Sequence, residues 1–336
     1  MELNKIMQGD VLEKLKEIPD ESVDCVITSP PYFGLRDYGV EGQIGLEKTL
    51  DEYLDKMLAV TKELKRVLKK TGTMFWNHGD SYGGSGNGSW NAPIEIRGKQ
   101  YRKTCNIDQE YLGPPRKDKT LIVKCLMLQN YRLAIRMIDE QKWILRNILI
   151  WHKPNCMPSS VKDRFTVDYE PVFFFTKSRQ YWFEQQFESY APANDVRYRQ
   201  ALRSNKEYNV KAPYRSNTPY AGYKKGQGTV AHRDNVAPQN HLLVGGDGQG
   251  RTKRCVWKIP TQPFSEAHFA TFPEDLIMPM VKAGCPEGGI VLDPFGGAMT
   301  TCVVAKKLRR NFIAIELNPV YIEIGKRRLF FPEPML

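Results

Sequence analysis

Short apolar runs alternate with longer stretches in which apolar residues recur at helical spacing. A leucine stripe predicts a helix over 50–70, with Gly72 as its stop, and 126–142 predicts a second helix of the same character. The alternation predicts an α/β fold with a doubly wound, mostly parallel sheet. The runs bounded by turn residues, each a predicted buried strand, are 23–28, 73–77, 147–151, 171–176, 290–293 and 311–316.

Two stretches interrupt this alternation. Residues 83–120 open with a run of Gly, Ser and Asn and carry seven Lys/Arg against four Asp/Glu. Residues 184–255 carry twelve against six, with six tyrosines interleaved. Basic and aromatic side chains in this mixture are typical of nucleic-acid binding, whereas the alternative is a solvated, partly disordered insertion. The candidate DNA-binding residues of the second stretch are Arg197, Arg199, Arg203, Arg215 and Lys224.

The overall composition agrees with a polyanionic partner. Lys and Arg exceed Asp and Glu by 11, and the sequence pI is ≈ 9.2. No apolar run approaches the ~18 residues of a membrane span, and the N-terminus lacks a signal-peptide core. We therefore expect no membrane partner and a cytoplasmic location. The seven cysteines form no CxxC pair, so neither a zinc site nor a disulfide framework is expected.

The first candidate site follows the predicted strand 23–28 directly. It is the tetrapeptide Ser29-Pro30-Pro31-Tyr32, whose prolines force an extended turn without amide donors. A serine hydroxyl, a prolyl carbonyl and an aromatic face thus gather at the carboxyl end of a strand, where open α/β sheets bind ligands. This group suits the flat amino group of a nucleobase. A plain surface turn is the alternative.

The second candidate site lies near the C-terminus. A predicted strand ending at Asp293 leads into a turn with Gly296 and Gly297 and then into an apolar helix. Strand, glycine turn and helix N-terminus together are typical of a nucleotide-type pocket. Glu316 ends the next strand, 23 residues after Asp293, where an acid accepts hydrogen bonds from ribose hydroxyls. Without GxGxxG, an adenosyl ligand is favoured over a dinucleotide. A dinucleotide oxidoreductase, the rival, would leave the tetrapeptide at Ser29 unexplained.

The two motifs in this order resemble the DNA amino-methyltransferases of the permuted β group. That group places the catalytic motif first, target recognition in the middle and the cofactor motif last. The resemblance implies a Rossmann-like sheet of seven strands, S-adenosylmethionine as cofactor and double-stranded DNA as partner. It assigns the catalytic part of the domain to 1–183, target recognition to 184–255 and the cofactor-binding part to 256–336. It also allows a cognate restriction endonuclease as partner, and a monomer or homodimer. The resemblance covers 7–36, 50–82, 126–184 and 268–329.

Individual roles follow from the same resemblance. Asp10 matches the acid beside the cofactor adenine, and Phe272 belongs to a segment that packs on its methionine end. Met299 stands where the family usually has a second glycine. The cofactor-binding candidates are Asp10, Thr28, Phe272, Asp293, Pro294, Phe295, Gly296, Gly297, Thr300 and Glu316.

The catalytic candidates are Ser29, Pro30, Pro31 and Tyr32. The Ser29 hydroxyl and the Pro30 carbonyl would accept the two amino hydrogens of an extruded base, and Tyr32 would stack on that base. Tyr32 in place of a cysteine excludes the covalent route to C5 of cytosine. The resemblance ties a leading serine to N4 of cytosine and a leading Asp or Asn to N6 of adenine. We therefore predict cytosine, with adenine as the alternative and a non-catalytic DNA-binding protein as the third interpretation.

Overall fold

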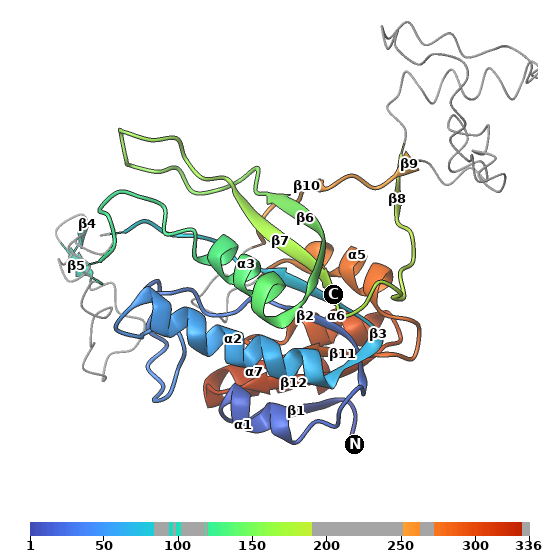
Figure 1. Cartoon of the computed structure of the whole chain (residues 1–336). Coiled ribbons are helices and arrows are strands. Elements are labelled where there is room, and N and C mark those ends of the chain that lie inside the picture. Colours follow the sequence, from blue (N-terminus) through green and yellow to red (C-terminus); the bar gives the residue numbers. More distant parts are fainter. Residues whose placement is uncertain are drawn as a thin grey trace, which may run out of the picture. The chain divides into compact units, whose positions relative to one another are not determined.

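Eight strands form one mixed sheet in the order β1-β12-β11-β2-β3-β7-β6-β10 (Figure 1). The computed structural model describes residues 1–83, 94–96, 99–101, 118, 120–189, 251–262 and 272–330. The strands of the sheet are β1 (Lys5–Gln8), β2 (Val23–Thr28), β3 (Leu68–Asn77), β6 (Ile144–His152), β7 (Tyr169–Thr176), β10 (Val256–Lys258), β11 (Ile290–Asp293) and β12 (Asn311–Glu316). The helices are α1 (Val11–Lys16), α2 (Leu50–Val67), α3 (Gln129–Gln141), α5 (Glu274–Gly284), α6 (Thr300–Lys307) and α7 (Pro319–Phe330).

The pairing confirms the doubly wound, mostly parallel α/β class. Strand β7 runs antiparallel to both of its neighbours, β3 and β6, and the remaining pairs of the sheet are parallel. The sheet has one strand more than the seven expected. The two edge strands, β1 and β10, are only four and three residues long. Such short segments carry too little apolar pattern to be recognised in the sequence.

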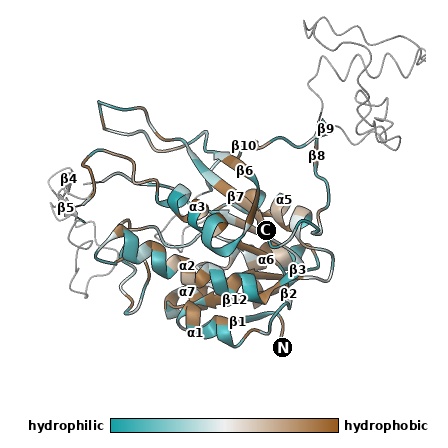
Figure 2. Ribbon diagram, viewed as in Figure 1, coloured by the Kyte–Doolittle hydropathy of each residue, from teal (hydrophilic) through white to brown (hydrophobic). Residues whose placement is uncertain are grey.

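Helices cover both faces of the sheet, and each face has its own apolar core. Helices α1, α2 and α3 contribute to one core, and α5, α6 and α7 to the other. Because side chains alternate along a strand, Phe173 and Phe175 of β7 enter the first core while Val172 and Phe174 enter the second. Figure 2 shows the apolar strands between helices whose outer surfaces are polar.

The first predicted helix is shorter than expected. Helix α2 begins with a capping box between Thr49 and Glu52, and it ends at Val67 rather than near Lys70. Leu68 is already extended and pairs with Val23, so the expected stop, Gly72, lies inside β3. The leucine stripe misled because Leu68 is fully buried in the same core from either type of element.

The described part of the chain contains two further pairs of short strands. Strands β4 (Ile94–Ile96) and β5 (Lys99–Tyr101) form an antiparallel ladder, as do β8 (Phe187–Glu188) and β9 (Arg251–Thr252). Chain contacts divide the protein into a unit of 1–184 with 255–336 and a second unit of 185–254. Within the described ranges, no helix combines the length and apolar composition needed to cross a membrane.

Candidate functional site

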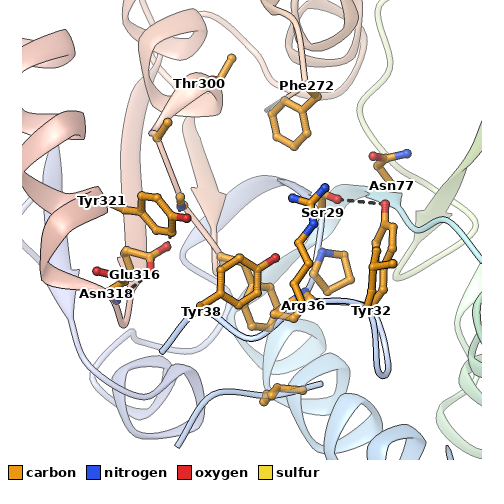
Figure 3. A pocket seen from close by; sticks show the side chains of 18 of the residues that line it. Ser29, Tyr32, Arg36, Tyr38, Asn77, Phe272, Thr300, Glu316, Asn318 and Tyr321 are labelled. Atoms are coloured by element: carbon orange, nitrogen blue, oxygen red, sulfur yellow. Dashed lines mark hydrogen bonds between the residues drawn. The ribbon is translucent and has the colours of Figure 1, made fainter. Parts of the chain in front are cut away.

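A cavity of about 840 Å³ lies at the carboxyl edge of the parallel strands. The loops after β1, β2, β11 and β12 line it, together with the end of β6 and the start of the antiparallel strand β7. This volume lies within the ~300–1,000 Å³ that is usual for ligand pockets. Figure 3 shows its two ends, with Ser29, Tyr32 and Asn77 at one and Glu316, Asn318 and Tyr321 at the other.

The structure brings most of the candidate residues to this cavity. All four residues of the catalytic tetrapeptide line it. The DNA-binding candidates Arg197, Arg199, Arg203, Arg215 and Lys224 lie outside the described residues. The cofactor-binding candidates that line the cavity are Asp10, Phe272, Pro294, Phe295, Gly296, Gly297, Thr300 and Glu316.

Thr28 and Asp293 are not among the residues that line the cavity. Both are buried, and the Thr28 hydroxyl donates to Asp293 Oδ1 over 2.7 Å. The same carboxyl oxygen accepts the Phe295 amide at 3.1 Å, and burial raises the pKa of Asp293 to about 6. The pair therefore ties the catalytic turn to the glycine turn. No direct contact with a ligand follows from these positions.

A buried network holds the catalytic turn in place. The Tyr53 hydroxyl donates to the Pro31 carbonyl at 2.8 Å and lies 3.1 Å from His78 Nε2. Trp76 donates to the other ring nitrogen of His78 at 3.3 Å, so the imidazole proton is on Nε2 and faces Tyr53. Burial lowers the pKa of His78 to about 3, and the ring is neutral at physiological pH. Because His78 is neutral, the network keeps its polarity across that range.

Tyr32 is held through its hydroxyl. The hydroxyl donates to Glu170 Oε2 at 3.2 Å and lies 3.4 Å from Ser29 Oγ. Lys153 in turn pairs with the other oxygen of Glu170. A side chain at Gly79 would place its Cβ 2.8 Å from the Tyr32 ring, so glycine allows this close approach. Glu170 and Lys153 were not among the candidates, and their only signal in the sequence is their position at the ends of two adjacent strands.

The opposite end of the cavity is built around Glu316. Its two carboxyl oxygens accept the Gly297 amide at 2.7 Å and the Asn318 amide at 2.8 Å. Burial raises the pKa of this carboxyl. The rings of Tyr38 and Tyr321 meet edge to face, with centroids 6.4 Å apart. This end offers one carboxylate and two aromatic rings to a ligand.

Met299 adopts the conformation of the glycine that it replaces. Its φ of 62° and ψ of 27° lie in the left-handed region, directly before α6. The side chain is fully buried. A Cβ at Gly325 of α7 would lie 2.2 Å from Met299 Cγ, so this glycine makes the room for the methionine. The glycine turn thus keeps its path through a second glycine elsewhere in the chain.

We expect Gly325→Ala to destabilise the fold, because the added methyl group overlaps Met299. Overpacking of this kind costs about 1–3 kcal/mol of unfolding free energy. Met299→Gly in the same chain should recover part of the loss, because it removes the overlapping side chain. Denaturant titration of both single variants and the double variant measures this coupling. Lys326→Ala, exposed on the same helix, is the control, and equal losses in it and in Gly325→Ala would contradict the expectation.

Comparison with known proteins follows from this geometry. A family model described as DNA methylase matches residues 23–327. The type II methyltransferase M.Cfr9I of Citrobacter freundii is 35% identical over 331 residues, which cover 98% of this chain and 89% of the relative. The chain belongs to the DNA methylase family. The DNA adenine methyltransferase YhdJ of Escherichia coli is 26% identical over 98% of the chain and 83% of its own length. The resemblance to DNA amino-methyltransferases is therefore confirmed.

Solved structures give this methylase its fold. The cytosine-N4-specific PvuII DNA methyltransferase superposes with a TM-score of 0.61 at 19% identity, covering 100% of this chain and 89% of the other. The DNA modification methylase TTHA0409 of Thermus thermophilus, complexed with S-adenosyl-L-methionine, has a TM-score of 0.51 at 18% identity and covers 98% and 96%. Both confirm the Rossmann-like methyltransferase fold.

The cavity of this methylase suits S-adenosylmethionine. Asp10 and Glu316 bring carboxyl groups to the wall, as hydroxyl and amino groups of an adenosyl ligand require. Gly297 has a φ of +49°, and a Cβ built on it would have open space around it. The backbone there can therefore approach a ligand closely. Across the described residues, no group of three or more His, Cys, Asp or Glu side chains could hold a metal ion.

Proposed function

We propose that this DNA methyltransferase transfers a methyl group from S-adenosylmethionine to the exocyclic N4 of cytosine in double-stranded DNA. One observation carries the proposal. The turn with Ser29 at its head opens into the same cavity as Gly297 and Glu316. A base amino group at one end and an adenosyl ligand at the other would meet inside that cavity. Membership of the DNA methylase family supports the reaction class.

The exocyclic amine of a base is a poor nucleophile, because its lone pair is delocalised into the ring. Acceptors on both amino hydrogens pull the nitrogen toward tetrahedral geometry and free that lone pair. Ser29 Oγ is one acceptor. The Pro31 carbonyl already accepts from Tyr53, so we assign the Pro30 carbonyl as the other.

Bound S-adenosylmethionine supplies an electrophilic sulfonium methyl group. The amino nitrogen forms the new bond to this carbon, while the carbon–sulfur bond breaks and its electron pair stays on sulfur. The nitrogen then loses one proton to solvent. Since the charged product nitrogen is acidic, the protein needs no strong base and contributes mainly by positioning.

Ser29 at the head of the tetrapeptide supports cytosine over adenine, following the family tendency described above. Adenine is the second candidate, because it also presents an amino group beside a ring nitrogen and because YhdJ is a DNA adenine methyltransferase. For sequence recognition we propose residues 184–255, whose basic and aromatic composition suits DNA. The similarity to type II methyltransferases supports a restriction endonuclease as cognate partner.

The expected product is N4-methylcytosine. DNA methylated by the purified enzyme is digested to nucleosides and analysed by mass spectrometry, and sequencing with base-modification detection gives the recognised site. A digest containing N6-methyladenine alone would overturn the choice of cytosine and keep the enzyme class. Unmodified DNA in the presence of S-adenosylmethionine would contradict the proposed function itself. Ser29→Ala enzyme provides the background sample.

A further inference from the structure

A chain of polar groups leads from the surface of β6 to the catalytic serine. We propose that this chain fixes the Ser29 hydroxyl as a hydrogen-bond acceptor, so that the site selects an amino group and rejects a keto oxygen. The inference rests on the proposed function, in which the target base enters this end of the cavity. It assigns Glu170 and Lys153 as positioning residues, which act on the base through Tyr32 and Ser29.

The charged end of the chain sets its direction. Lys153 pairs with Glu170 Oε1, and the Lys153 ammonium lies 4.3 Å from the centroid of the Trp151 ring. The strand register places Trp151 opposite Glu170, and Lys153 follows two residues later on the same edge. Both charged side chains are only about a fifth exposed, at 19% and 21%. A carboxylate held by an ammonium group has no proton of its own and can only accept hydrogen bonds.

Tyr32 transmits this polarity. Its hydroxyl has one proton, which goes to Glu170 Oε2 at 3.2 Å. The amide of Gly79 donates to the Tyr32 oxygen, which leaves one lone pair for the contact with Ser29 at 3.4 Å. Burial first, and the charge of Glu170 second, raise the pKa of Tyr32 well above its ordinary value. The phenol is therefore protonated, and the Ser29 hydroxyl must be the donor in their contact.

The consequence falls on Ser29. Its only proton points to Tyr32, so its lone pairs remain for a donor in the cavity (Figure 3). The amino group of cytosine or adenine offers N–H donors. A keto oxygen at the same place, as in uracil, thymine or hypoxanthine, would face a second acceptor. Polar groups of a site that are left unpaired in this way discriminate strongly between otherwise similar substrates.

The test uses Tyr32→Phe, which keeps the ring and removes the hydroxyl. The freed Ser29 hydroxyl can then rotate and donate to a keto oxygen. We compare duplexes that carry cytosine or uracil at the target position, with S-adenosylhomocysteine bound, and take the ratio of their dissociation constants. Adenine and hypoxanthine replace this pair if the enzyme methylates adenine. Tyr32→Phe should reduce the preference for the amino base about tenfold, the effect of one hydrogen bond. The easier opening of a mismatched pair cancels, because each enzyme binds the same two duplexes.

Two further variants separate the chain of groups from a merely structural role. In a Ser29→Ala background, Tyr32→Phe should cause no additional loss of preference, because the hydroxyl that it orients is gone. Glu170→Gln should lower the preference in the same direction as Tyr32→Phe. Tyr169→Phe, the neighbouring exposed tyrosine on β7, is the matched control and should behave as wild type.

An unchanged preference in both Tyr32→Phe and Glu170→Gln would overturn the proposal. Independent, multiplying effects of the Ser29 and Tyr32 substitutions would overturn it too. Neither result touches the proposed function, which fails separately if the wild-type enzyme methylates no DNA.

Discussion

Ser29→Ala is expected to slow methyl transfer by about 10²–10³-fold, by analogy with the loss of one transition-state hydrogen bond in an enzyme. Cofactor affinity should change little, because Ser29 lies at the end of the cavity away from Glu316. Single-turnover assays with labelled S-adenosylmethionine give the rate of the chemical step. Isothermal titration gives the cofactor affinity of the same preparation.

The control for this substitution is Ser159→Ala, an exposed serine in the loop between β6 and β7. It should leave rate and affinity unchanged. If Ser29→Ala lost cofactor affinity in proportion to its rate, Ser29 would belong to the cofactor subsite. A normal rate in Ser29→Ala would remove it from the reaction altogether.

Glu316→Ala is expected to weaken S-adenosylmethionine binding by about 1.5–3 kcal/mol, the usual value of a hydrogen bond to a charged group. Two effects act in the same direction. The ligand loses an acceptor for its hydroxyl groups, and the Gly297 and Asn318 amides lose the carboxyl group that holds them. Isothermal titration measures the affinity, and the rate at saturating cofactor should stay near that of wild type.

Glu323→Ala is the matched control, because it removes an exposed acid from the neighbouring helix α7. It should bind the cofactor as wild type does. Unchanged affinity in Glu316→Ala would refute the ribose role and leave Glu316 as a purely structural brace of the glycine turn. Glu316→Gln, which keeps one acceptor oxygen, should fall between the two.

The sequence was sufficient for the features that depend on local pattern. The apolar runs located the six long strands of the sheet, and their order placed Ser29 and Gly296 at the same edge. Both residues line one cavity in the structure. This prediction worked because the carboxyl ends of parallel strands must meet at one edge, whatever the exact packing of the helices.

Features that depend on long-range geometry escaped the sequence. Thr28 and Asp293 were predicted to hold the cofactor, yet they hydrogen-bond each other across 265 positions of the chain. Glu170 reaches Tyr32 across 138 positions. Which strand ends face each other depends on sheet order and register, and a single sequence does not encode them in any local pattern.

The pairing of Met299 with Gly325 links the two positions among the relatives of this enzyme. A glycine at 299 would leave a void that a larger residue at 325 can fill, whereas a side chain at 299 demands glycine at 325. Sequences of this family should therefore exchange the two residues together, and an intermediate with two side chains should be rare. Consensus engineering that changes position 299 alone would leave the interior beneath α7 underpacked. Substitutions at this turn are best designed as pairs.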